Sequence, residues 1–125
     1  MSIPLHDPAW LERMYNNRAL VPDYMDYLQR WAQDSAQVRA NCPCALDLVY
    51  GPEAGETLDV FPATRPGAAL APVLVFIHGG YWRSLDKSDH SFVASAFADE
   101  GAMVVVPNYA LCPAVSMERI PLQLT

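Results

Sequence analysis

The chain has 125 residues, a formal net charge of −6 and a hydrophobic fraction of 52%. This length allows at most one domain, and the apolar content is that of a globular protein rather than a disordered one. The acidic balance argues against nucleic acid and anionic lipid as partners, because phosphate groups are bound by basic surfaces.

The segment Met1–Asp7 lacks the basic and apolar regions of a signal peptide, and no apolar run approaches the ~18 residues of a membrane span. We therefore expect a cytoplasmic protein without a membrane partner. Cys42 and Cys44 are a candidate metal or redox pair, but the sequence has no second Cys/His pair that could complete a metal site. No dinucleotide or Walker motif occurs either, so we expect no metal and no cofactor.

Two helices are expected in the first third of the chain, and residues 1–41 are assigned to an N-terminal helical extension. The first helix covers Pro8–Arg18. The second begins near Pro22, which suits a first helical turn, and ends at an Asn-Cys-Pro stop that starts at Asn41. Its apolar stripe is made of side chains spaced three and four residues apart, namely Tyr24, Tyr27, Leu28, Trp31, Ser35 and Val38. We interpret the stripe as a packing face.

Two short strands should follow, Ala45–Tyr50 and Thr57–Phe61, joined by a polar loop. Their alternating pattern predicts an antiparallel hairpin of half-buried strands, with Leu58 and Val60 on the face opposite Asp59. The segment from Pro62 to Pro72 holds three prolines and one glycine and is expected to be a connector.

The next unit is a predicted strand, helix and strand. Val73–Ile77 is entirely apolar and favours a parallel strand that is buried on both faces. After a glycine turn, Asp86 or Ser88 can cap a helix. Ala102–Val106 is a second apolar strand, which should run parallel to the first. The helix takes its apolar face from Phe92, Val93, Ala96 and Phe97, and its terminal glycine is Gly101.

The glycine turn carries a resemblance to a known family. Residues 78–82, His-Gly-Gly-Tyr-Trp, resemble the His-Gly-Gly motif of α/β-hydrolase esterases and lipases, and the Tyr-Trp continuation is closer to the arylformamidase (kynurenine formamidase-like) branch. Residues 107–113, Pro-Asn-Tyr-Ala-Leu-Cys-Pro, and 15–18, Tyr-Asn-Asn-Arg, resemble the same branch. The resemblance covers nearly the whole chain but only the N-terminal half of the family's pattern.

The resemblance implies that residues 42–125 are an incomplete α/β-hydrolase domain, because such domains commonly need about 200–250 residues. The strand Ala102–Val106 should then lie between Thr57–Phe61 and Val73–Ile77. For the aromatic N-terminal extension, the resemblance implies an alternative role at the mouth of a substrate pocket.

The resemblance also assigns roles at the glycine turn. The backbone N–H groups of Gly80 and Tyr81 become the oxyanion hole, which stabilises the negative oxygen of an acyl-transfer transition state. His78, Gly79 and Trp82 are expected to support this loop. We expect His78 to hold the loop by hydrogen bonds rather than to act as a base, and Trp82 either to wall the pocket or to pack beneath the loop.

The family's nucleophile lies in a Gly-x-Ser-x-Gly elbow, and this chain contains no such sequence. No histidine, whether His6, His78 or His90, follows a candidate nucleophile in the family's order. Asp86 and Ser88 lie close to His90 and are an alternative triad, but we expect both to serve as helix caps. The catalytic nucleophile, acid and base are therefore expected outside the 125 residues, with the elbow roughly 25–45 residues after Thr125.

The leading hypothesis is that the complete protein cleaves a small-molecule ester or aryl formamide through a serine nucleophile. The alternatives are a non-catalytic ligand-binding protein on the hydrolase scaffold and an inactive truncated fragment. On any of these readings we expect this chain alone to be inactive. We also expect it to self-associate through the uncovered edge of the strand Val73–Ile77.

Overall fold

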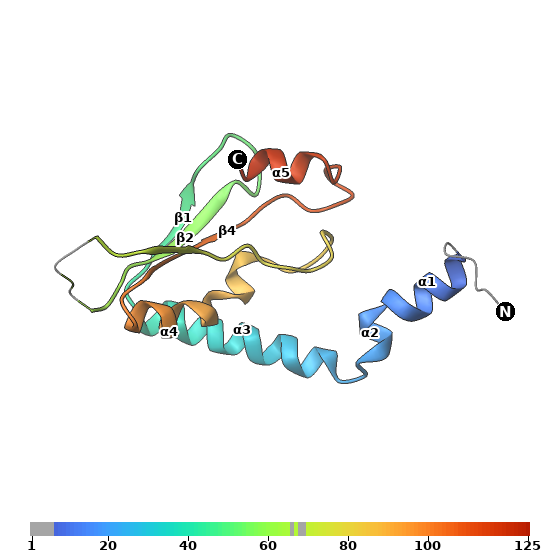
Figure 1. Ribbon diagram of the computed structural model, residues 1–125, viewed down its shortest axis with the longest axis horizontal. Helices are drawn as coiled ribbons and strands as arrows, with labels where there is room; N and C mark the ends of the chain where they lie inside the picture. Colours follow the sequence, from blue (N-terminus) through green and yellow to red (C-terminus); the bar gives the residue numbers. More distant parts are fainter. Residues whose placement is uncertain (1–6, 66, 68–69) are drawn as a thin grey trace. The chain divides into compact units, whose positions relative to one another are not determined.

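The computed structural model describes residues 7–65, 67 and 70–125. The chain divides into two compact units, residues 1–30 and 31–125. The expected boundary after residue 41 stays a prediction. The elements, labelled as in Figure 1, are α1 Pro8–Tyr15, α2 Asn17–Leu20, α3 Tyr24–Asn41, β1 Ala45–Val49, β2 Thr57–Phe61, β3 Val73–Val75, the 3₁₀ turns η1 Lys87–Asp89 and η2 Ser91–Val93, α4 Ala94–Asp99, β4 Met103–Pro107 and α5 Arg119–Gln123.

The first unit contains α1, α2 and the start of α3. The prediction of one helix over Pro8–Arg18 is wrong, because Asn16 interrupts it. The Asn16 side chain accepts a hydrogen bond from the N–H of Ala19 and so caps a new helix, α2. α3 ends at Asn41 as predicted from the following Cys-Pro pair.

The second unit is built on a four-stranded sheet in the order β1-β2-β4-β3. β1 and β2 form the predicted antiparallel hairpin, and β3 pairs parallel with β4 as predicted. The sheet therefore places the carboxyl ends of β3 and β4 at the same edge, and the segments that follow both strands meet there.

One face of the sheet holds the core. Figure 1 shows α4 and the C-terminal part of α3 on this side. The core consists of Phe61, Ala94, Val104 and Val106, with Val38, Cys44, Leu74 and Phe76 packed against it. Burial of such apolar side chains provides most of the stabilisation of a domain of this kind.

The faces of the strands differ in part from expectation. Asp59 lies opposite Leu58 and Val60 as predicted, and Asp59 is the side chain that points into the core, since it is paired in register with the buried Val106. The strand Val73–Ile77 was expected to be buried on both faces. Its alternate side chains are exposed at 59% for Val73, 56% for Val75 and 52% for Ile77, because β3 is an edge strand with one uncovered face.

The segment after the glycine turn differs from the predicted helix in its first turns. Asp86 caps it as expected, with a capping box that also includes Asp89. The two turns η1 and η2 come before α4, which has only six residues. Gly101 follows α4 with φ +94°, the left-handed conformation that favours glycine after a helix. The connector that was predicted from Pro62 to Pro72 lies partly outside the described residues.

Candidate functional site

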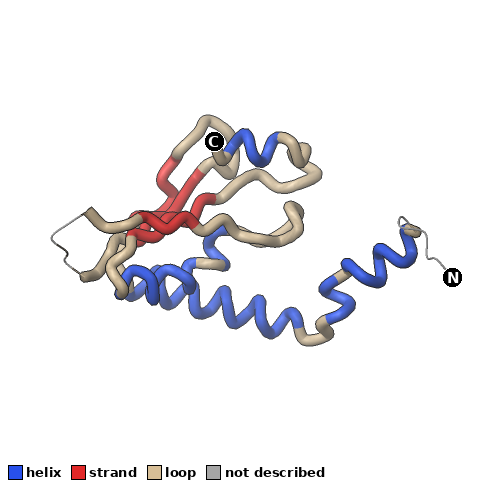
Figure 2. Tube along the Cα trace, viewed as in Figure 1, coloured by secondary structure: helices blue, strands red, loops and turns tan. Residues whose placement is uncertain are grey.

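The loop between β3 and η1 is the centre of the candidate site, and Figure 2 shows it in tan between the strand and the first turn. Three consecutive residues have positive φ, with 124° at Gly80, 56° at Tyr81 and 58° at Trp82. Such conformations are uncommon outside glycine and persist only when the surrounding structure fixes them. A Cβ at Gly80 would overlap the carbonyl of Ser84, whereas one at Gly79 would meet nothing.

This turn leaves two backbone donors open. The Gly80 carbonyl accepts hydrogen bonds from the N–H groups of Arg83 and Ser84. Within the part of the chain that the structure describes, no group accepts a hydrogen bond from the N–H of Gly80 or Tyr81. Tyr81 is 66% exposed, so the turn faces solvent. Adjacent unpaired N–H groups can bind a negatively charged oxygen.

His78 lies beneath the loop and is 2% exposed. Its Nδ1 is 2.7 Å from the carbonyl oxygen of Gly79, and its Nε2 is 3.0 Å from Oδ1 of Asn108. Its ring stacks on Tyr109 at 4.4 Å and on His90 at 5.4 Å between centroids. The Tyr109 hydroxyl donates to the His78 carbonyl at 2.6 Å. The imidazole is therefore enclosed on both faces and does not reach the open N–H groups.

Trp82 is the predicted support residue whose role was left open. Its side chain is exposed and lies beside the Tyr81 ring, with 5.4 Å between centroids. Its carbonyl accepts a hydrogen bond of 2.8 Å from the N–H of Cys112, which connects the loop to the segment after β4.

Asp86, Ser88 and His90 do not form a catalytic triad. Asp86 accepts from the Ser88 N–H at 2.9 Å and from Asn108 Nδ2 at 2.6 Å. Burial would raise the pKa of Asp86, but these hydrogen bonds outweigh it and hold the pKa below its usual value. His90 Nδ1 lies 3.1 Å from the backbone carbonyl of Asp86, not from its carboxylate. The predicted capping role is therefore the one the structure shows for Asp86.

A buried ion pair between η1 and β2 adjoins this polar region. Lys87 Nζ lies 2.6 Å from Oδ1 of Asp59 and 2.7 Å from Oδ1 of Asp47, and the Lys87 side chain is 6% exposed. Burial alone would lower the pKa of Lys87, but hydrogen bonds to both carboxylates outweigh it and raise the pKa. The second Asp59 oxygen, Oδ2, has no partner among the described groups.

Sequence reasoning missed three members of this region, namely Asn108, Lys87 and Asp59. A signal existed for Asn108, which directly follows an apolar strand and so belongs at the ligand-binding edge of a parallel sheet. Asp59 gave no such signal, because an alternating strand pattern does not state which face is covered.

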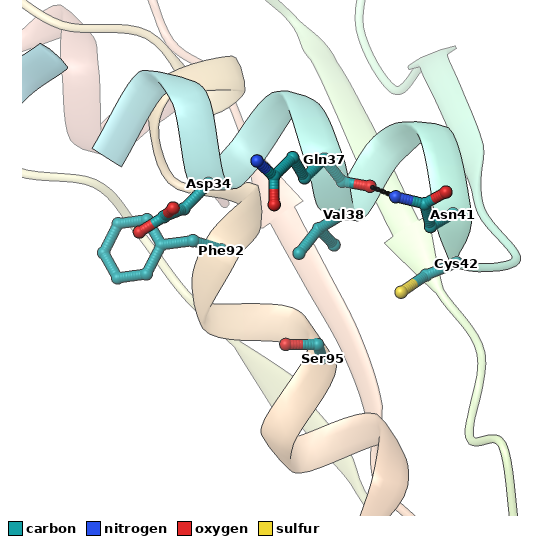
Figure 3. Close-up of a pocket in the computed structure, with 7 residues that line it drawn as sticks. All are labelled: Asp34, Gln37, Val38, Asn41, Cys42, Phe92 and Ser95. Carbon is teal, nitrogen blue, oxygen red and sulfur yellow. Dashed lines mark hydrogen bonds between the residues drawn. The ribbon is translucent and has the colours of Figure 1, made fainter. Parts of the chain in front are cut away.

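A shallow hollow of about 430 Å³ lies elsewhere in the second unit, between α3 and the η2–α4 segment, and Figure 3 shows its lining. Asp34 and Phe92 line one end of the view and Cys42 lies at the other. None of the predicted site residues lines it. None of the polar side chains that line it is fully buried.

Cys42, Cys44 and Cys112 are free thiols. Among the described residues, no cluster of three or more His, Cys, Asp or Glu side chains could hold a metal ion. In the same residues, every helix is too short or too polar to cross a membrane.

The sequence is similar to kynurenine formamidases. It is 33% identical to the enzyme of Danio rerio over 79 residues, which are 63% of this chain and 27% of that protein. It is 37% identical to the enzyme of Drosophila melanogaster over 78 residues, which are 62% of this chain and 25% of that protein. The match thus spans about a quarter of these relatives. No protein-family model matches the chain.

Solved structures show the same fold. A protein of Silicibacter sp. TM1040 described as a candidate thioesterase matches with a TM-score of 0.82 and 33% identity, over 91% of this chain and 43% of that one. Esterase B of Lactobacillus rhamnosis matches with a TM-score of 0.61 and 22% identity, over 84% of this chain and 36% of that one. The four-stranded sheet and its helices therefore correspond to part of an α/β-hydrolase fold.

Proposed function

We propose that this chain, which is related over part of its length to the kynurenine formamidases and α/β-hydrolase esterases, carries the oxyanion-binding loop of a serine hydrolase. The substrate class is a small-molecule ester or aryl formamide. The N–H groups of Gly80 and Tyr81 bind the carbonyl oxygen as it becomes negative in the transition state. His78, Gly79 and Trp82 support the loop.

The observation that carries this proposal is the left-handed turn at the carboxyl end of β3. It combines two unpaired N–H groups, at Gly80 and Tyr81, with a backbone that only local constraints can maintain. Preorganised donors of this kind stabilise developing charge without a reorganisation cost. In hydrolases of this fold, one oxyanion donor comes from the corresponding loop after the third strand.

The 125 residues lack a Gly-x-Ser-x-Gly elbow, and the two described histidines are buried and stacked on each other. The chain therefore supplies substrate positioning and charge stabilisation, while the nucleophile and its base come from other residues of the complete protein. The missing elbow equally favours a second function, in which the same loop binds a carboxylate or carbonyl ligand without catalysis.

The test compares this chain with a longer polypeptide, in which the residues encoded after Thr125 are also present. We expect hydrolysis of p-nitrophenyl acetate or of formanilide by the longer polypeptide only, with a covalent acyl intermediate visible by mass spectrometry. Gly80→Ala keeps the backbone N–H, but its Cβ would overlap the Ser84 carbonyl and displace the turn. In the longer polypeptide we therefore expect kcat to fall about 100-fold, the effect of losing an oxyanion donor. Asn41→Ala, at the end of α3, is the matched control.

Turnover by the 125 residues alone would contradict the division of roles proposed here. A longer polypeptide that binds benzoate or acetanilide but hydrolyses no ester or formamide would favour the ligand-binding function. Full activity in Gly80→Ala would show that the turn is not the oxyanion site.

A further inference from the structure

Asn108 directly follows β4 and uses every polar group that it has. Its backbone N–H donates to the carbonyl of Thr57 at 2.8 Å, and its carbonyl accepts from the hydroxyl of Tyr50 at 2.6 Å. These two bonds tie its backbone to the β1–β2 hairpin. The side chain is thereby held at a fixed place at the carboxyl edge of the sheet.

The side-chain amide of Asn108 has only one orientation that its neighbours allow. Oδ1 accepts from the backbone N–H of Lys87 at 3.2 Å, and Nδ2 donates to Oδ2 of Asp86 at 2.6 Å. If the amide were flipped, its NH₂ group would face the N–H of Lys87, which is also a donor. Its oxygen would then face the carboxylate of Asp86, which is also an acceptor. Oδ1 therefore also faces Nε2 of His78, and because Oδ1 can only accept, a hydrogen bond between the two requires the proton to be on Nε2.

Asn108 and its neighbour Tyr109 thus contact His78 at two points. Asn108 accepts from the ring at 3.0 Å, and the Tyr109 hydroxyl donates to the backbone carbonyl at 2.6 Å. His78 lies two residues before Gly80, where the left-handed turn begins. A turn of this kind, with Tyr81 and Trp82 also at positive φ, needs constraints on both sides of it.

We propose that Asn108 is the positioning residue of the glycine loop, fixing the ring of His78 and, through it, the left-handed turn that presents the N–H groups of Gly80 and Tyr81. Its use in acyl transfer rests on the proposed function, but its effect on the loop does not. Asn108 touches no reacting atom and acts only through His78 and Asp86.

The experiment measures hydrogen exchange at backbone amides whose hydrogen bonds depend on the turn. Ser84 N–H donates to Gly80 O at 3.1 Å, and Cys112 N–H donates to Trp82 O at 2.8 Å. The reference is Met103 N–H, which donates to Pro72 O at the opposite end of the sheet. Hydrogen–deuterium exchange of the full chain is measured at these amides, on a dilute sample.

Asn108→Asp keeps the acceptor for His78 but replaces the donor to Asp86 by a second carboxylate. We expect exchange at Ser84 and Cys112 to become about tenfold faster or more, with Met103 within about threefold of its original rate. The matched control Asn41→Asp, whose side chain makes one exposed bond to Gln37 O, should change none of these rates.

The double variant Asp86→Asn with Asn108→Asp exchanges the donor and the acceptor, so that residue 86 donates to residue 108. It should restore the exchange rates of the loop to within about threefold of the original chain. Asn108→Leu should accelerate exchange in the loop, and adding Asp86→Asn to it should restore nothing. A residue that only stabilised the whole fold would accelerate the loop and Met103 together, and that result would overturn the proposal.

A further measurement needs no variant. In the unmodified chain, ¹⁵N NMR of the imidazoles should show a proton on Nε2 of His78 at neutral pH. An unprotonated Nε2 would contradict the orientation on which the proposal depends. If the unmodified longer polypeptide hydrolyses no ester or formamide while the exchange results for the Asn108 variants are as expected, the proposed function is refuted. The positioning role of Asn108 is then unaffected.

Discussion

Single residues decide whether the glycine loop can form, and the two adjacent glycines are not equivalent. Gly80 has φ +124° and no room for a Cβ beside the Ser84 carbonyl, whereas Gly79 lies outside the left-handed region and faces open space. We expect Gly80→Ala to lower the free energy of unfolding by about 2 kcal/mol. Gly79→Ala should change it by less than about 0.5 kcal/mol. Urea denaturation of both variants measures the difference, and equal losses would contradict the geometry.

A second residue-scale effect is the pH dependence caused by His90. Burial lowers the pKa of His90 below its usual value, although its hydrogen bond to the Asp86 carbonyl acts in the opposite direction. As the pH falls below about 6.5, the unfolded chain binds a proton at His90 that the folded chain does not, so stability falls until the pH reaches the lower folded pKa.

His90→Asn removes this titration and leaves an amide that can still donate to Asp86. We expect the free energy of unfolding of this variant to decline less between pH 7 and pH 5 than that of the original chain. The measurement is urea denaturation at several pH values in one buffer system. An unchanged decline would assign the pH dependence to another group.

At the scale of elements, the sequence pattern predicted all four strands, the antiparallel pair β1–β2 and the parallel pair β3–β4, and the family resemblance implied that β4 lies between β2 and β3. The strands and pairs were predictable because apolar runs such as Ala102–Val106 and turn residues mark strands locally, and because strands joined by a crossover helix run parallel. The exposure of β3 and the inward direction of Asp59 could not be read in this way. Both depend on which other elements cover a face, and that is a property of the assembled fold.

The candidate site was predictable only in its local part. The glycine turn is contiguous in sequence, so its residues were identified from the pattern. The supporting network is not contiguous, since Asn108 and His78 are 30 residues apart and Lys87 and Asp59 are 28 apart. These side chains meet only after the β3–α4–β4 crossover has formed.

The ion pair between Lys87 and Asp59 connects η1 to β2 and gives a prediction at the element scale. Both side chains are buried, so Lys87→Met should leave the Asp59 carboxylate without its partner. We expect a loss of about 3–5 kcal/mol in the free energy of unfolding. The double variant Lys87→Met with Asp59→Leu should lose clearly less than Lys87→Met alone. A double-mutant cycle by chemical denaturation checks this, and additive losses would show that the two side chains are not coupled.

At the scale of the whole molecule, the sheet has two edges of different character. β1 has a bulge and carries the charged Asp47, which adopts φ +56° and interrupts the regular register. Charges and bulges protect an edge from pairing with another chain. β3 has no charge and no bulge, and it continues as an apolar run to Ile77. Uncharged segments rich in β-branched residues are prone to pair with copies of themselves.

We therefore expect the isolated chain to self-associate through β3 and not through β1. Val75→Lys places a charge on the β3 edge, at a side chain that is 56% exposed, and should shift the chain toward monomer over a concentration series in sedimentation velocity. Val49→Lys adds the same charge to β1, at a side chain that is 77% exposed, and should leave the association unchanged. Because both substitutions add one positive charge to an exposed valine of an edge strand, a general effect of net charge would appear in both variants equally. Equal dissociation in the two variants, or a monomeric original chain at every concentration, would show that the β3 edge is not the contact.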